Sequence, residues 1–427
     1  MKFRILSFVL SVLLLIPALS AVTCAYAAEP EMGEYIITLS DEGRRDYLRD
    51  YLLKEYGGCL LAEYHTLLRG FAITLPKAEA WKIPGLAGVE SLLVSLTRTR
   101  AAVTAFPLCD GSGDGSDISA ASITNTLSEP DTGVSESEKP GKASRSVISP
   151  RAALGEEYDG LRGEGMIIAV VDSSFDVTHP LFTLSADTGI ALTRPEVDEL
   201  QKAKLSIANS IVTKKQDAYV SAKIPFAYDY VGRDTDTFTT DSHGTHVAGI
   251  LAANAKGAEN GFDGIAPEAQ LLLMKCQGDT GTDGFKDYAI VAACEDALLL
   301  GADVINISAG APASFEDYSG ETVDYNALTK KIHEAGTAVV CAAGNEGSLG
   351  IGVGTGYEEK YGVSGPPAAH PDTGVISCPS AGEYALAAAS YNGELSAYDD
   401  GLLLTDGIPA PCWDGSISSF GSEFAGR

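Results

Sequence analysis

Basic residues are scarce in this sequence. The 427 residues include 30 Lys and Arg against 58 Asp and Glu, which gives a formal net charge of -28. A surface this acidic repels phosphate groups, which excludes a protein whose task is to bind nucleic acid. The charge suits a protein kept soluble outside the cell, although charge alone identifies no function.

Long apolar runs are also absent after residue 22, where no segment reaches the roughly 20 apolar residues that span a bilayer. Two basic residues precede the apolar run 5–22, and Ala25-Tyr26-Ala27 has the small-x-small pattern of a cleavage site. Pro17 interrupts the run, which disfavours a membrane anchor. We therefore predict a signal peptide over residues 1–27, a secreted or cell-envelope location, and no membrane span in the mature chain.

The eight cysteines show no C-x-x-C spacing. Loss of Cys24 with the signal peptide would leave seven (8 − 1), and an odd number cannot be fully paired. Cys276, Cys294 and Cys341 lie inside apolar segments. This placement predicts small buried side chains with no chemical role.

Residues 33–100 have the pattern of a small α+β domain with one antiparallel sheet. Strands are predicted at 35–39, 71–75 and 89–96, an amphipathic helix at 41–58, and a short helix around Trp81. Residues 101–150 are rich in Ser, Gly and Asp, which is typical of a flexible linker. The acids of 110-DGSGDGSD-117 lack the distal Glu of a calcium loop, so we interpret them as linker too.

The third part, residues 151–427, alternates between strand and helix patterns. Segment 166-MIIAVV-171 is an unbroken apolar run, as expected for a strand covered on both faces. Strands are further predicted at 271–275, 302–308 and 337–343, and helices at 245–254, 287–301 and 325–336. The alternation predicts an α/β fold with a doubly wound, mostly parallel sheet, whose ligands bind at the carboxyl ends of the strands.

Three polar residues lie where such a fold places its active site. Asp172 follows the strand 166–171, His243 opens the next helix, and Asn345 follows the strand 337–343. Each residue alone is commonly structural, as a loop cap, a satisfied polar group or a turn residue. Together they meet the needs of acyl transfer, in which a carboxylate orients an imidazole base and an amide donates to an oxyanion.

Five segments carry a resemblance to a known family. They are 168-IAVVDSSFDVTHP-180, 241-DSHGTHVAGI-250, 264-GIAPEAQLLLMK-275, 302-ADVINISAG-310 and 341-CAAGNEG-347. In this order they resemble the subtilisin-like serine peptidases, or subtilases, most closely the cell-envelope proteinase (lactocepin-like) branch. The resemblance implies a subtilisin-like fold, incomplete at its C-terminal end. It also makes residues 33–100 similar to a subtilase propeptide, an intramolecular partner that assists folding and then inhibits.

The resemblance implies a role for each matching residue. Asp172 orients the base, His243 is the base, and Asn345 is the side-chain donor to the oxyanion. The substrate backbone pairs with one short strand, which consists of Ser308, Ala309 and Gly310. Two positions depart from the family, which has glycine in place of Ser174 and leucine in place of Ala309. These departures affect the shape of a loop and the subsite preference, not the mechanism.

The family nucleophile lies in a Gly-Thr-Ser-x-Ala motif, and these 427 residues contain no such motif. No serine after Asn345 is followed by a convincing helix, so we predict that the nucleophile is absent from this chain. The chain is then a truncated catalytic domain of a secreted endopeptidase, inactive as given. The alternative is a pseudopeptidase that captures extended peptides.

Other kinds of site are disfavoured. A phosphoryl-accepting Asp172 would need a second Asp where Ser174 stands, and His243 with His246 would form a metal site with no third ligand. We predict no metal in the site and no required cofactor. Calcium could stabilise so acidic a chain, but no ligand set can be named. The expected partners are protein or peptide substrates and the propeptide.

Overall fold

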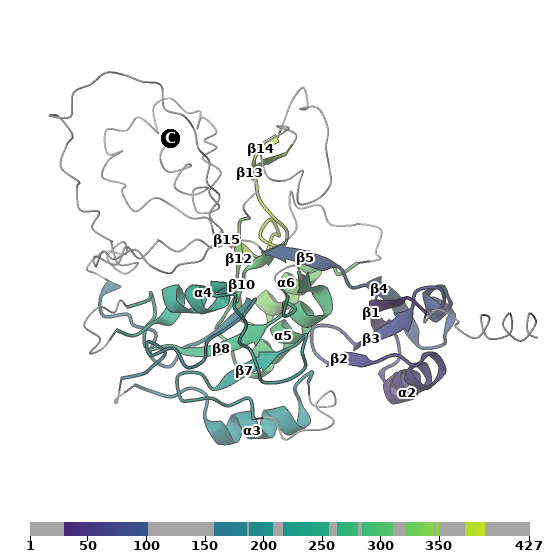
Figure 1. The fold of residues 1–427 in the computed structure, drawn as a ribbon, viewed down its shortest axis with the longest axis horizontal. Coiled ribbons are helices and arrows are strands. Elements are labelled where there is room, and N and C mark those ends of the chain that lie inside the picture. The colour runs from purple at the N-terminus through teal and green to yellow at the C-terminus, as the bar shows by residue number, and fades with distance from the viewer. Residues whose placement is uncertain are drawn as a thin grey trace, which may run out of the picture. The chain divides into compact units, whose positions relative to one another are not determined.

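The computed structural model describes residues 30–100, 158–185, 188–207, 217–255, 263–280, 284–310, 322–344, 347–349 and 372–388. The chain divides into two compact units (Figure 1). The first unit comprises residues 1–96 and 317–323, and the second comprises 97–316 and 324–427. The predicted signal peptide and linker lie outside the described residues.

The first unit is a four-stranded antiparallel sheet with one main helix. Its elements are β1 (Met32–Leu39), η1 (Glu42–Arg44), α2 (Arg45–Tyr56), β2 (Leu60–Tyr64), β3 (Gly70–Pro76), η2 (Ala80–Gly85) and β4 (Val89–Val94). The strand order is β2-β3-β1-β4. Leu48 and Leu52 of α2 are buried in one cluster with Ile37, Phe71 and Ile73 of the sheet, which holds the helix on that face.

The second unit is built on a six-stranded sheet in which every pairing is parallel. Its strands are β6 (Ile167–Asp172), β7 (Phe226–Asp229), β8 (Gln270–Lys275), β10 (Val304–Ile307), β12 (Ala338–Ala342) and β15 (Leu386–Ala388), in the order β15-β12-β10-β6-β8-β7. Every residue of β6 and β8 is buried. Such strands are covered on both faces, as in a doubly wound fold.

Four helices accompany this sheet in the described part of the unit: α3 (Arg194–Ala203), α4 (His243–Ala252), α5 (Asp287–Leu299) and α6 (Tyr325–Glu334). Helix α4 contacts β6 and β8, α5 contacts β6, and α6 contacts β12. Helix α3 begins with a capping box between Thr193 and Glu196. Helix α6 begins with Asp324, whose side chain accepts a hydrogen bond from the N–H of Ala327.

Two smaller sheets complete the second unit. One has the order β11-β5-β9 and consists of β11 (Ala309–Gly310), β5 (Thr97–Arg100) and β9 (Phe285–Lys286). The other pairs β13 (Gly347–Leu349) with β14 (Asp372–Val375). A search of the described residues finds no helix that is both long and apolar enough to cross a membrane.

The predicted fold class is confirmed, because a parallel sheet with helices follows an antiparallel sheet. The short helix predicted around Trp81 is η2, a 3-10 helix that contains Pro84. Helix α3 was not predicted, nor were strands β2, β5, β7, β9, β13, β14 and β15. Residues 97–100, which we placed in the first domain, pair with strands of the second unit.

Candidate active site

Asp172 and His243 come together at the carboxyl end of the parallel sheet. Asp172 is the last residue of β6 and His243 is the first residue of α4. Nδ1 of His243 lies 2.7 Å from Oδ1 of Asp172, and both side chains are buried. A carboxylate only accepts hydrogen bonds, so in the neutral imidazole Nδ1 carries the proton and Nε2 has a free lone pair. We call this pair the dyad.

The alternation of side chains along β6 explains why Asp172 faces α4. Ile168, Val170 and Asp172 lie on one face of the strand because successive side chains point to opposite faces. Ile168 and Val170 belong to the same buried cluster as Val247 and Ala248 of α4. The core that holds α4 on the sheet therefore also directs Asp172 toward the start of that helix.

Gly244 lets the first turn of α4 approach the loop after β6. A Cβ at Gly244 would lie 2.5 Å from the carbonyl oxygen of Ser174 and 3.1 Å from Cβ of Asp172. A side chain at this position would therefore push the helix away from the loop. Glycine allows the contact, and the preceding residue, His243, then reaches Asp172.

Several polar atoms at the dyad have no hydrogen bond. Oδ1 of Asp172 accepts from the N–H of Ser173 at 2.6 Å and from His243. Among the described residues, Oδ2 of Asp172, Oγ of Ser173 and Nε2 of His243 are buried without a partner. Buried polar atoms are rarely left unpaired unless they have a function or a ligand. Nε2 of His243 is thus available to accept a proton from a reacting group.

A strand-binding edge lies beside the dyad. The N–H of Ser308 donates to the carbonyl of Val171, so the chain leaves β10 next to the end of β6. Ala309 and Gly310 then form β11 and pair antiparallel with Arg100 and Thr99 of β5. Because β5 is antiparallel to β11, it runs back toward the end of β6, where the dyad lies.

The comparison with known families decides the identity. A profile described as the subtilase family matches residues 163–422, more than half of the chain. The chain belongs to the subtilase family. The match includes β6 with Asp172 and α4 with His243, and the resemblance found in the five sequence segments is confirmed.

Two relatives illustrate how much of this subtilase is matched. The PI-type proteinase of Lactococcus lactis subsp. cremoris is 30% identical over 272 residues, which are 62% of this chain and 13% of that protein. The C5a peptidase of Streptococcus pyogenes is 34% identical over 254 residues, 57% of this chain and 20% of that one. The chain thus spans a small fraction of these relatives' length.

Solved structures were compared as well. The epidermin leader peptide processing serine protease of Staphylococcus aureus aligns with a TM-score of 0.47 at 16% identity. The alignment covers 84% of this chain and 70% of that chain.

The other site residues expected from the sequence are Asn345 and the strand 308–310. Asn345 lies outside the described residues, just after β12 and the positive-φ Gly344. Ser308 is buried, and its Oγ accepts a hydrogen bond from Nδ2 of Asn306 at 2.9 Å. The structure thus brings Asp172, His243 and the 308–310 strand to one edge of the sheet.

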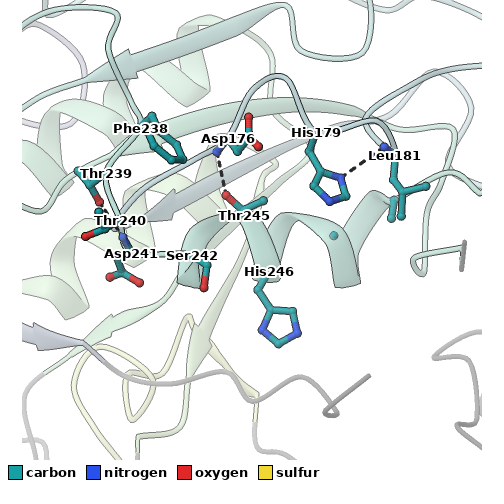
Figure 2. Close-up of a pocket in the computed structure, with 12 residues that line it drawn as sticks. Asp176, His179, Leu181, Phe238, Thr239, Thr240, Asp241, Ser242, Thr245 and His246 are labelled. Carbon is teal, nitrogen blue, oxygen red and sulfur yellow. Dashed lines mark hydrogen bonds between the residues drawn. The ribbon is translucent and has the colours of Figure 1, made fainter. Parts of the chain in front are cut away.

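A pocket of about 520 Å³ lies beside α4 but does not include the dyad (Figure 2). Thr245 of its lining points toward Asp176, and its Oγ1 accepts from the N–H of that residue at 2.8 Å (Figure 2). His246, also in the lining, has its pKa lowered by burial and then by nearby His243.

The described thiols of the second unit are buried away from solvent. Cys276, Cys294 and Cys341 are unpaired and fully buried, as the sequence predicted. Burial raises the pKa of the Cys276 thiol well above its usual value, which makes it a poor nucleophile. Among the described residues, no three His, Cys, Asp or Glu side chains are arranged to hold a metal ion.

Two features of the site were missed in the sequence. Oδ1 of Asp241 accepts the N–H of His243 at 3.0 Å and so fixes the backbone at the start of α4. An Asp whose side chain binds the N–H two residues further on is a common turn motif, and this signal could have been used. The position of β5 against β11 had no signal in the sequence, because 97-TRTR-100 has no apolar residue.

Proposed function

We propose that this subtilase is the N-terminal portion of a secreted endopeptidase that hydrolyses peptide bonds in proteins. Asp172 would orient His243, His243 would be the general base, and Asn345 would donate to the oxyanion. The nucleophilic serine is not among these 427 residues. The observation that carries the proposal is the buried dyad, in which Nδ1 is bound by a carboxylate and Nε2 has no partner in the described structure.

The chemistry follows from this arrangement. Asp172 holds the proton on Nδ1, which selects the tautomer with its lone pair on Nε2. When Nε2 takes the proton of a serine hydroxyl, the imidazolium that forms is stabilised by the same carboxylate. The side-chain amide of Asn345 would then donate to the oxyanion of the tetrahedral intermediate.

The pairing of β5 supports an extended peptide as the substrate. β5 lies between β9 and β11, and Nζ of Lys286 donates to Oγ1 of Thr97 at 3.1 Å. A substrate in the place of β5 would add a strand through backbone hydrogen bonds, which favour any extended sequence. We propose that Ser308, Ala309 and Gly310 bind substrate in this way, and that residues 33–100 inhibit as a propeptide.

A fluorophosphonate probe, which labels activated serines, tests the proposal. The 427-residue chain should stay unlabelled, because a base without its nucleophile catalyses no acyl transfer. The chain fused to a family segment with the Gly-Thr-Ser motif should be labelled at that serine. His243→Ala in the fusion is the control and should abolish labelling. Labelling of the unfused chain that depends on His243, or no labelling of the fusion, contradicts the proposal.

The second candidate function is capture of extended peptides without cleavage. It is favoured by the pairing of β5 with both β9 and β11, which shows that a strand fits between them. The test is a fluorescent peptide with the sequence of residues 94–101. Thr99→Pro with Arg100→Pro removes two N–H donors from β5 and should weaken its own pairing. The double variant should then bind the peptide at least about tenfold more tightly than the unchanged chain.

Secretion and cofactor use are separate proposals. We propose cleavage of the signal peptide after Ala27, which N-terminal sequencing of the exported protein would test. We also propose that no cofactor is required. Calcium would act on stability alone. A chelator should therefore change the melting temperature of the fusion but leave its fluorophosphonate labelling intact at temperatures well below melting.

A further inference from the structure

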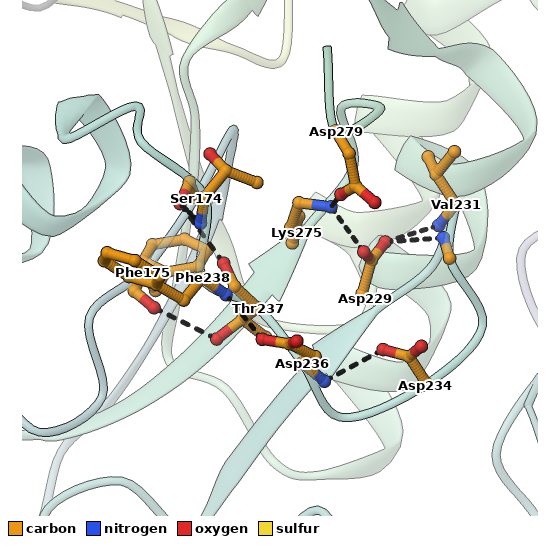
Figure 3. A network of polar contacts seen from close by, with 12 residues as sticks. Ser174, Phe175, Asp229, Val231, Asp234, Asp236, Thr237, Phe238, Lys275 and Asp279 are labelled. Atoms are coloured by element: carbon orange, nitrogen blue, oxygen red, sulfur yellow. Dashed lines mark hydrogen bonds and ion pairs between the residues drawn. The ribbon is translucent and has the colours of Figure 1, made fainter.

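Ser174 stands where the family has glycine, and it contacts the segment that leads to the base (Figure 3). Its side chain is fully buried. Oγ of Ser174 donates to the carbonyl of Thr237 at 3.2 Å and accepts from the N–H of Thr239 at 2.8 Å. A glycine could make neither bond.

The neighbouring residues tighten the same contact. The N–H of Phe175 donates to the carbonyl of Thr237 at 2.9 Å, and Oγ1 of Thr237 donates to the carbonyl of Phe175 at 3.2 Å. Phe175 is fully buried in the cluster that holds α4. The loop after Asp172 is thus fixed to both the core and the loop before His243.

From Ser174 a series of hydrogen bonds leads to the base. Ser174 accepts from the N–H of Thr239, Oγ1 of Thr239 accepts from the N–H of Asp241 at 3.1 Å, and Oδ1 of Asp241 accepts from the N–H of His243 at 3.0 Å. Each side chain after Ser174 binds the N–H two residues further on. We call these three bonds the ladder.

We infer that Ser174 is a positioning residue for His243, acting through the ladder. The first rung fixes Thr239 to the loop of Asp172, and the next two fix the backbone of His243 to Thr239. Nδ1 of His243 is thereby held on Oδ1 of Asp172. The functional meaning of this inference rests on the proposed role of the dyad. The geometric claim itself concerns only the bond between His243 and Asp172.

The direct test measures how fast the proton on Nδ1 of His243 exchanges with solvent. It uses NMR of the full chain labelled with 15N-histidine. The unchanged protein should give an exchange-protected imidazole N–H signal that is lost in His243→Gln. In Ser174→Ala this proton should exchange at least about tenfold faster, because the loss of buried hydrogen bonds lets the dyad open more often. Ser174→Gly, the family's residue, should behave in the same way.

A second variant, Thr239→Val, tests the same inference even where Ser174→Ala fails to fold. Thr239 is only part-buried, and Thr239→Val removes the acceptor of the second rung while keeping the shape of the side chain. It should also speed exchange, whereas Thr239→Ser keeps the hydroxyl and should preserve the signal. Ser185→Ala is the matched control, because it removes a hydroxyl bonded to Glu268, away from the ladder.

Three results would overturn the inference. They are a missing imidazole signal in the unchanged protein, unchanged exchange in both Ser174→Ala and Thr239→Val, and equal acceleration in Ser185→Ala. None of them depends on a nucleophile. Failure of the fusion to react with the fluorophosphonate would instead count against the peptidase function and leave the ladder intact.

Discussion

Replacement of Glu268 by glutamine should destabilise the second unit in a pH-dependent manner. Glu268 is buried, with 3% of the residue exposed. It accepts hydrogen bonds from the N–H of Ser185 at 2.9 Å, from Oγ of the same residue, from Oγ1 of Thr188 at 2.6 Å and from Nδ2 of Asn254 at 3.0 Å. Arg162 adds a more distant positive charge at 3.8 Å.

These contacts set the size of the effect. Burial alone would raise the pKa of Glu268, but the hydrogen bonds from Ser185, Thr188 and Asn254 outweigh it and lower the pKa from 4.5 to about 2. The difference of about 2.5 pKa units, at about 1.36 kcal/mol each, corresponds to about 3 kcal/mol. Since the pKa of the folded state is the lower one, this stabilisation is complete above pH 4.5 and disappears as the pH falls through about 2.

Hydrogen exchange of the slowest amides in β6 and β8 provides the assay, because these amides report unfolding of the second unit alone. The free energy of unfolding of the unchanged chain exceeds that of Glu268→Gln, and this difference should shrink by about 3 kcal/mol between pH 6 and pH 2. The exposed helix-capping residue Glu196 is the control, and Glu196→Gln should leave these amides nearly unaffected at every pH. A difference for Glu268→Gln that stays constant from pH 6 to pH 3 would refute the account of its carboxylate.

Three further predictions concern the site and the linker. Gly244→Ala should cost about 1–3 kcal/mol of stability by overpacking and abolish probe labelling of the fusion. Gly249→Ala in the same helix should preserve stability and labelling, because its new Cβ would meet nothing within 4 Å beyond the adjacent backbone of that helix. Asn345→Ala in the fusion should lower turnover by roughly 100- to 1,000-fold, the range reported for a related subtilisin residue, and leave the Michaelis constant nearly unchanged in steady-state assays. Limited proteolysis should cut first within residues 109–150, because their composition leaves little backbone to bury; a first cut within 287–345 would contradict the domain division.

The sequence predicted best those elements whose residues are almost all apolar. The predicted strand 166–171 is shifted by one residue from β6, and 271–275 lacks only the first residue of β8, because burial on both faces leaves an unbroken apolar run. The apolar pattern of helix α4 predicted a helix from residue 245, whereas the helix begins at His243, which the pattern of polar residues had placed at its start. Its first turn carries the polar residues of the site, so the apolar periodicity starts late.

Short or polar elements escaped prediction for a different reason. β7 has four residues, too few to show a pattern, and it is stabilised as an edge strand by pairing with β8. β5 pairs with β9 and β11, which lie more than 180 residues further along the chain. No local property of 97-TRTR-100 encodes that pairing, because its stabilisation comes from backbone groups that every sequence has.

Some residues of the candidate site could be predicted from the sequence, and others could not. Asp172 and His243 could be predicted because base chemistry requires these residue types and the family motif fixes their order. The ladder could not, because Ser174, Thr239 and Asp241 are residues common in any loop. The sequence indicated only that the departure at Ser174 affects the shape of a loop, whereas in the structure its side chain makes two hydrogen bonds. Because glycine offers no such bonds, the effect of this residue has to be measured in this chain.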